Sequence, residues 1–189
     1  MRERLLRAAL ELFTRRGYDQ TSLDQVAGAA GFTKGAVYSN FTSKDELFLT
    51  LMDQQVGRRI DQVREALRAD GGRADSARRV GDRLTAALDE DREWQLLFLD
   101  YVLRAARDEA VREQFVAHRR RIRSLVADAV RELVSLPEGS GLDVDAIAST
   151  LLALQNGLGI ERLVEPAAVR DDLLGTLLQA LQPPGTTIG

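Results

Sequence analysis

The chain has 189 residues, a formal net charge of −3 and 44% hydrophobic residues, enough for one large domain or a small domain joined to a larger one. It contains no cysteine and one histidine, His118, which excludes disulfides, thiolate metal sites, cysteine nucleophiles and multi-histidine zinc sites. No window approaches about 18 continuous apolar residues, so no membrane span is expected. The N-terminus leads into an amphipathic helix without an apolar signal-peptide core, so we expect a cytoplasmic protein. Nothing in the sequence calls for a cofactor.

Apolar residues at helical spacing predict a first helix from about residue 2 to Arg16, namely Leu5, Leu6, Ala9, Leu12 and Phe13. Gly17 should end this helix, because glycine adopts left-handed backbone at little cost. Arg2 and Arg4 at its start are placed either to reach a phosphate backbone or simply to remain solvated. The sequence leaves both readings open.

Two short helices joined by a tight turn are predicted next. Ser22 caps the first, and Gln25 at the third helical position bonds back to complete a capping box. Gly31 ends that helix. Thr33 then caps the second helix, Lys34 to about Ser39. This arrangement is a helix-turn-helix.

The second short helix has a face that is poorly suited to core packing. Val37 and Phe41 should point inward, whereas the remaining positions are short, polar or exposed: Lys34, Gly35, Ala36 and Tyr38. A helix start with threonine, lysine and small residues suits close approach to a phosphate backbone.

A long helix should follow from Ser43 to about Leu67. Ser43 can cap it, with Glu46 completing a second capping box. Lys44 lies at the positive end of this helix, where a phosphate would also bind. A helix this long, joined to the preceding segment without a linker, is a plausible lever between two domains.

Residues 1 to about 50 resemble the DNA-binding domain of the TetR family of bacterial transcriptional regulators. The matching pieces are Ala8-Ala9-x-x-x-Phe13-x-x-x-Gly17-Tyr18, Thr21-Ser22-Leu23-x-x-Val26-Ala27, and Ala30-Gly31-Phe32-Thr33-Lys34-Gly35-Ala36-Val37-Tyr38-x-x-Phe41-x-x-Lys44-x-x-Leu47. Phe32 departs from the family, which more often has a smaller aliphatic residue there. The rest of the chain resembles the family only in pattern. We predict a DNA-binding domain over residues 1–46 and an effector-binding and dimerisation domain over residues 47–189.

The resemblance implies a role for each candidate DNA-binding residue. The major groove and its rim should be faced by Thr33, Lys34, Gly35, Ala36 and Tyr38. Phosphates should be bound mainly by Thr21, Ser22, Tyr38, Asn40 and Lys44. The two lysines of the chain are Lys34 and Lys44, and both fall at these positions, although chance in an arginine-rich composition gives the same picture. Tyr38 has an alternative role in packing against the first helix.

The rest of the chain reads as helices only, so we predict an all-α fold of about nine helices without strands. Helices are expected over about residues 76–88, 92–106 and 109–135, then from Asp143 as an N-terminal cap, and from Pro166 to about Leu181. The run Asp89-Glu90-Asp91 reads as a solvated acidic turn rather than a metal site.

Aromatic residues gather on one predicted face. The spacing of Trp94, Phe98 and Tyr101 puts three rings on the same side of a helix. A cavity for a largely apolar ligand is one interpretation, and ordinary core packing is the other. The candidate ligand-binding residues are Gln55, Trp94, Gln95, Phe98, Tyr101, Phe115 and His118.

The last two helices carry more leucine than one subunit of this size needs to cover itself. Burial across a two-fold axis would solve this, most simply as a four-helix bundle, and the resemblance implies the same homodimer. The candidate interface residues are Ile147, Leu151, Leu154, Leu158, Val169, Leu173, Leu177 and Leu181.

These features favour a regulator that binds a palindromic operator in double-stranded DNA as a homodimer, since the DNA-binding domains of the two subunits would read successive major grooves. The resemblance implies repression relieved by a small-molecule effector. A DNA-binding protein without an effector, and a regulator controlled by a partner protein, remain alternatives. No carboxylate pair, triad or glycine-rich phosphate loop is framed by a motif, so we do not expect an enzyme.

Overall fold

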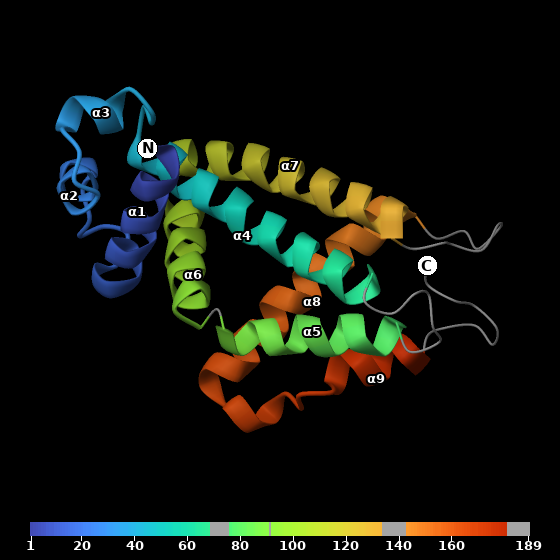
Figure 1. The fold of residues 1–189 in the computed structure, drawn as a ribbon. Coiled ribbons are helices and arrows are strands. Elements are labelled where there is room, and N and C mark those ends of the chain that lie inside the picture. Colours follow the sequence, from blue (N-terminus) through green and yellow to red (C-terminus); the bar gives the residue numbers. More distant parts are fainter. Residues whose placement is uncertain (69–75, 91, 134–142, 181–189) are drawn as a thin grey trace. The chain divides into compact units, whose positions relative to one another are not determined.

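The computed structural model describes residues 1–68, 76–90, 92–133 and 143–180, and within these ranges every regular element is a helix. The predicted all-α fold class is therefore confirmed. The α-helices, labelled in Figure 1, are α1 Arg2–Arg16, α2 Leu23–Ala29, α3 Lys34–Tyr38, α4 Lys44–Arg68, α5 Ser76–Glu90, α6 Arg92–Arg107, α7 Glu109–Leu133, α8 Val144–Val164 and α9 Leu173–Ala180. A 3-10 turn, η1 Pro166–Ala168, lies between α8 and α9 in the sequence.

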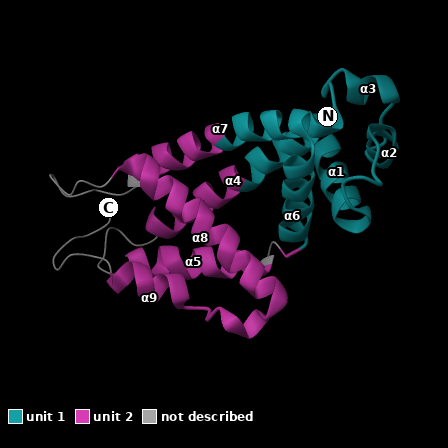
Figure 2. Cartoon of the chain, turned by 180° about the vertical axis from the view of Figure 1, so that it is seen from behind, with its two compact units in different colours: residues 1–55, 93–119 teal, residues 56–92, 120–189 magenta. Residues whose placement is uncertain are grey.

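The chain forms two compact units (Figure 2). Unit 1 consists of Met1–Gln55 and Glu93–Arg119, and unit 2 consists of Val56–Arg92 and Arg120–Gly189. The helices α4 and α7 each contribute residues to both units. The predicted boundary after residue 46 follows the helix-turn-helix motif, whereas compactness groups α6 and the first turns of α7 with that motif.

Aromatic rings dominate the core of unit 1. Phe48 on α4 stacks on Tyr101 of α6 with 4.3 Å between ring centroids, and Tyr18 packs edge-on against both rings. Phe13 stacks on Tyr18 at 5.4 Å. These four rings are almost completely buried, so the end of α1, the start of α4 and the middle of α6 share one core. Aromatic contacts of this kind contribute about 0.5–1.5 kcal/mol each beyond area burial.

The local signals that define the short helices are present as predicted. The Ser22 hydroxyl accepts a hydrogen bond from the Gln25 N–H, and the Gln25 side chain accepts one from the Ser22 N–H. The Thr33 hydroxyl accepts from the Ala36 N–H at 3.3 Å. Gly31 has a φ of +73°, in the left-handed region that glycine adopts cheaply.

The predicted capping box at the start of α4 is only half correct. The Ser43 hydroxyl accepts from the Glu46 N–H at 3.0 Å, as expected. The Glu46 carboxylate, however, accepts from the backbone N–H and the hydroxyl of Thr42, at 2.7 and 2.6 Å. Thr42 offers two donors to one oxygen of Glu46, which outweighs the single backbone donor of Ser43. These bonds lower the pKa of Glu46.

In unit 2, α5 and α9 pack with almost no side chain between their backbones. A Cβ added to Gly81 of α5 would lie 2.3 Å from the backbone nitrogen of Gly175 in α9. A Cβ on Gly175 would in turn lie 2.6 Å from the Arg78 carbonyl oxygen. Two facing glycines therefore set the closeness of this helix pair. On the neighbouring helix α8, the Gln155 amide donates to the Leu84 carbonyl at 2.9 Å.

The predicted continuous helix from Pro166 to Leu181 is wrong. Pro166 opens a 3-10 turn instead, and the chain is extended at Val169 before α9 begins at Leu173. The reason is Arg162 of α8, whose guanidinium donates to the Val169 carbonyl at 2.8 Å and to the Asp171 carboxylate at 2.5 Å. The extended backbone at Val169 directs this carbonyl toward the guanidinium and not along a helix axis. Leu181 lies outside the described residues.

The Arg162 side chain is 6% exposed and also binds the carboxylate of Asp89 at the end of α5. Asp89 therefore holds a buried cation and is not part of a solvated turn, since α5 continues to Glu90. Asp91 is outside the described residues. The predicted Asp143 cap on α8 is confirmed.

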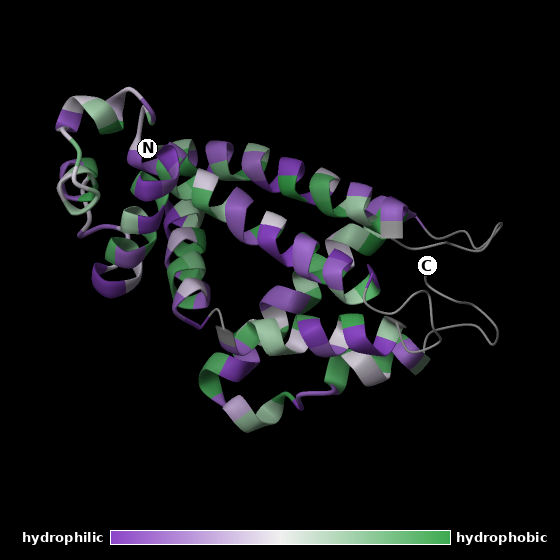
Figure 3. Ribbon diagram, viewed as in Figure 1, coloured by the Kyte–Doolittle hydropathy of each residue, from purple (hydrophilic) through white to green (hydrophobic). Residues whose placement is uncertain are grey.

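Hydrophilic and hydrophobic stretches alternate along the helices of both units (Figure 3), as in amphipathic helices that bury one face. Among the described residues, none of the helices combines the length and the apolar character that crossing a membrane requires.

Candidate nucleic-acid interface

The turn between α2 and α3 presents one side of α3 to solvent. Val37 of α3 and the following Phe41 are buried, as predicted, and Ala30 at the end of α2 is buried as well. On the other side, the Tyr38 side chain is 54% exposed, so the alternative role of Tyr38 in packing against α1 is not observed. Gly35 and Thr33 are also exposed. The α3 face is thus free of core packing.

Lys34, the first residue of α3, is paired with a carboxylate. Its ammonium binds Asp24 of α2, and the two side chains are 72% and 38% exposed. This bond raises the pKa of Lys34. The lysine lies at the predicted position, but its acidic partner was not foreseen from the sequence.

Three other candidate residues use their polar groups in hydrogen bonds to the protein backbone. Thr21 is buried, and its hydroxyl donates to the carbonyls of Gly17 and Leu12 at 3.1 and 3.3 Å. The Asn40 amide donates to the Ala36 carbonyl at 2.8 Å. Ser22, whose hydroxyl caps α2, remains exposed. The Thr21 hydroxyl thus fixes the entry to α2 and does not point to solvent.

Lys44 is half-buried and held by backbone oxygens. Its ammonium donates to the Tyr18 carbonyl at 2.9 Å and lies 4.3 Å from the centre of the Tyr18 ring. Burial lowers the pKa of Lys44. The ammonium therefore donates to two carbonyls of the loop after α1, those of Tyr18 and Asp19, and its role toward a phosphate stays a prediction.

One carboxylate joins the helix-turn-helix to α6. The same oxygen of Asp45 accepts from the Tyr18 phenol at 2.6 Å and from the Tyr101 phenol at 2.9 Å. Burial first, and the bonds to Asp45 second, raise the pKa of both phenols. Arg104 on α6 adds an ion pair with Asp19 at 2.9 Å. No local pattern of residues marks this network, because its members are far apart along the chain.

Two arginines of α1 flank the α2–α3 segment. The Arg2 guanidinium lies 4.8 Å from the centre of the Phe41 ring, and that of Arg4 lies 4.7 Å from the centre of the Phe32 ring. Arg4 also donates to the Ala30 carbonyl at 2.9 Å. Both residues are exposed, and stacking on rings leaves guanidinium donors available to a phosphate.

The predicted ligand-binding residues lie in unit 1, and their rings pack against one another. Trp94 stacks on Phe48 at 5.7 Å, and Phe115 lies 5.5 Å from Tyr101 and 6.3 Å from Phe98. His118 is fully buried, with its Nδ1 3.7 Å from the Asp53 carboxylate. Gln55 and Gln95 are half-buried. This arrangement is a core, and binding a ligand there would require the rings to separate.

The predicted interface residues differ in how much surface they retain. Val169 is 3% exposed and buried within its own chain, so it offers a partner little surface. Leu177 is 42% exposed, and Val164 at the end of α8 is 81% exposed. The other described members are half-buried: Ile147, Leu151, Leu154, Leu158 and Leu173.

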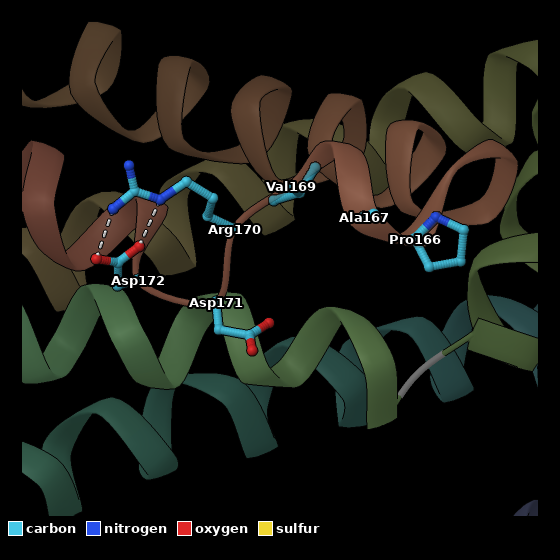
Figure 4. A pocket seen from close by; sticks show the side chains of 6 residues that line it. All are labelled: Pro166, Ala167, Val169, Arg170, Asp171 and Asp172. Carbon is cyan, nitrogen blue, oxygen red and sulfur yellow. Dashed lines mark hydrogen bonds and ion pairs between the residues drawn. The ribbon is translucent and has the colours of Figure 1, made fainter.

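An open cavity of about 550 Å³ lies beside the connector between α8 and α9 (Figure 4). It is lined by Pro166, Ala167, Val169, Arg170, Asp171 and Asp172. Arg170 and Asp172 form a two-bond ion pair at 3.0 and 2.8 Å. The lining is half apolar and half charged, and it contains none of the aromatic residues that the sequence suggested. No group of three or more metal-ligating side chains occurs among the described residues.

Two family models together match most of the chain. A model described as "Bacterial regulatory proteins, tetR family" matches residues 5–51. A second, described as "BetI-type transcriptional repressor, C-terminal", matches residues 73–182, more than half of the chain.

Individual proteins agree with these matches. The chain is 30% identical over 139 residues to the HTH-type transcriptional activator FasR of Mycolicibacterium smegmatis, covering 73% of this chain and 60% of FasR. It therefore spans less than two thirds of that relative. FadR of Bacillus subtilis, solved with stearoyl-CoA, has a TM-score of 0.66 at 17% identity, covering 98% of this chain and all of that one. A Saccharomonospora viridis regulator in complex with choline has a TM-score of 0.57 at 21% identity, covering 100% and 97%. At these identities the two structures establish the fold alone.

Proposed function

This chain belongs to the TetR family of bacterial transcriptional regulators, and from that premise we propose that it binds a palindromic operator in double-stranded DNA as a homodimer. Members of this family regulate transcription and are not enzymes. The observation that carries the proposal is the face of α3, where Lys34, Gly35 and Tyr38 are exposed while Val37 is buried. We propose the cytoplasm as its location, because bacterial DNA is there.

Base recognition falls to α3. Lys34 can donate to guanine O6 and N7, and Ala36 is small enough to contact a thymine methyl. Tyr38, Ser22 and Asn40 lie nearby for phosphate contacts, with Lys44 supplying a further donor. Arg2 and Arg4 extend the basic surface on the α1 side.

DNA binding is tested with duplexes selected by the protein from a randomised pool and measured by fluorescence anisotropy. Lys44→Ala should weaken binding to all duplexes alike. It should also lower the slope of log affinity against log salt concentration by roughly one unit for each DNA-binding domain of the dimer. Lys34→Ala should also relax preference at one or two base positions. If both variants bind as the wild type does, α3 and its surroundings are not the DNA-binding surface.

The homodimer is proposed to form through α8 and α9. Leu177 and Val164 leave apolar surface exposed there, and a two-fold axis would pair these surfaces in a four-helix bundle. Leu177→Arg should raise the dissociation constant at least about 100-fold, because an unpaired buried charge costs roughly 3–5 kcal/mol. Leu103→Arg on α6 is the matched control, since Leu103 is 52% exposed and outside this surface. A wild-type protein that sediments as a monomer at micromolar concentration contradicts the proposal.

We further propose that the protein represses transcription and is released from DNA by a small, largely apolar molecule that separates the rings of Phe98, Tyr101 and Phe115. Such a molecule acts only if it binds the opened shape more tightly than the DNA-bound one. The support is that two similar structures contain small molecules and that these rings lie beside α4. A panel of apolar aromatic compounds should quench Trp94 fluorescence and release DNA. Phe98→Trp should abolish release while DNA binding is kept, and unfolding of that variant would contradict the proposed site.

One observation favours an alternative, in which the regulator is controlled by a partner protein or has no effector. Phe48 and Tyr101 stack at 4.3 Å, and Phe115 packs against Tyr101 at 5.5 Å, so a ligand would have to break these ring contacts. Under this alternative no compound in the panel releases DNA, and the wild-type protein still binds its selected duplex.

A further inference from the structure

The charge of the α2–α3 segment does not match a simple phosphate-binding surface. Residues 20–46, all described by the structure, contain two lysines and three carboxylates. Lys44 is half-buried and donates to the Tyr18 and Asp19 carbonyls. Lys34 is therefore the exposed cation of this segment, and Asp24 binds it. A surface meant only to attract phosphate would not neutralise its most accessible lysine.

Asp24 loses a partner whenever Lys34 turns to another anion. One carboxylate oxygen of Asp24 binds the Lys34 ammonium. Its other oxygen, Oδ1, is buried and has no hydrogen-bond partner among the described residues. Water therefore does not reach this one oxygen, although the Asp24 side chain as a whole is 38% exposed. Without the nearby ammonium, the charge on that oxygen is less well compensated. Asp24 and DNA therefore compete for the same ammonium group.

We propose that Asp24 is a specificity-determining residue that suppresses sequence-independent DNA binding by holding Lys34. The inference rests on the proposed DNA-binding function. Binding without sequence preference depends on phosphate neutralisation by lysine and arginine. A phosphate alone must displace Asp24 and is repelled by it, whereas a guanine offers Lys34 two acceptors without a negative charge. The pair therefore penalises phosphate contacts more than base contacts.

Asp24→Asn tests this inference because it keeps the shape of the side chain and removes the charge. Affinity is measured over a range of salt concentrations for the duplex selected from a randomised pool and for a scrambled duplex of the same length. Freeing one lysine per head should raise affinity for the scrambled duplex about three- to ten-fold and steepen its salt slope by about 0.9 unit per head. Affinity for the selected duplex should rise less, so the ratio of selected-duplex affinity to scrambled-duplex affinity falls.

Two further variants separate the ion pair from a general charge effect. Glu11→Gln removes an exposed carboxylate of α1 and should leave the ratio unchanged. In the Lys34→Ala background, Asp24→Asn should change scrambled-duplex affinity by less than about two-fold. Thermal unfolding monitored by circular dichroism checks that each variant is folded. Asp24→Glu changes the side chain but keeps the charge, so it should keep the wild-type ratio of selected-duplex to scrambled-duplex affinity.

The outcomes are distinct. A lower ratio in Asp24→Asn that disappears without Lys34 supports the inference. An unchanged ratio, or an equal effect with and without Lys34, overturns it while leaving the proposed DNA binding intact. Wild-type protein that selects no duplex from the pool overturns the proposed function and this inference with it.

Discussion

Replacing Gly81 with alanine should force α5 and α9 apart. The added Cβ would lie 2.3 Å from the Gly175 nitrogen, 2.3 Å from the Leu174 carbonyl carbon and 2.5 Å from the Gly175 Cα. All three are backbone atoms, so no side-chain rotation relieves the overlap. Ordinary contact begins at 3.4 Å, which means that α9 must retreat by about 1 Å.

The expected cost follows from two opposing terms. Overpacking a well-packed core costs about 1–3 kcal/mol, and a clash between backbones lies at the upper end of that range. Alanine returns about 1 kcal/mol through its higher helix propensity. The net loss is therefore about 2 kcal/mol, which corresponds to a fall in melting temperature of about 4–8 °C for a chain of this size.

Gly57→Ala is the matched control, because Gly57 is also helical and a Cβ there would meet nothing within 4 Å. It should stabilise the protein by up to about 1 kcal/mol. Thermal unfolding of both variants, followed by far-ultraviolet circular dichroism, measures the difference. If Gly81→Ala melts at or above the temperature of Gly57→Ala, the close backbone packing of α5 and α9 is refuted.

Three further predictions concern other parts of the chain. The raised pKa values of the Tyr18 and Tyr101 phenols stabilise the fold below pH 10 and lose that contribution as pH rises through the folded values, so Tyr101→Phe should flatten the alkaline limb of a stability–pH curve. Arg162→Met should lower the free energy of unfolding in urea by about 1–3 kcal/mol, because the buried Val169 carbonyl loses its donor, whereas the exposed Arg170→Met should cost less than about 1 kcal/mol. Gly157→Ala, with open space around its Cβ, should stabilise the monomer by about 0.5–1 kcal/mol yet raise the dimer dissociation constant in sedimentation, because in the proposed dimer the methyl would meet the partner subunit.

Local signals accounted for most of the fold. The capping residues Ser22 and Thr33 act within one helical turn, so a short stretch of sequence is enough to place α2 and α3. Helical spacing likewise placed α6 and most of α7 to within about two residues, as such patterns usually allow. The exposed face of α3 was predicted because its residues are poor core formers.

Long-range polar partners were not predictable from these signals. Arg162 binds Asp89 across 73 positions of sequence, and no periodic pattern marks such a pair. The leucine spacing beyond Pro166 suggested one helix, whereas the bond from Arg162 to the Val169 carbonyl interrupts it. Thr21 was likewise assigned outward, because the internal acceptors of its hydroxyl depend on the tertiary fold.

The bridge formed by Asp45 also limits how this protein can be recombined with its relatives. A chimaera that exchanges only the segment matching the family's N-terminal model, residues 5–51, would carry Tyr18 and Asp45 but leave Tyr101 behind. Unless the recipient supplies a phenol at the same place, Asp45 keeps one donor instead of two, and Phe48 loses the ring stacked on it. A DNA-binding segment that is moved into a relative should therefore include α6, although α6 lies about 40 residues beyond the end of residues 5–51.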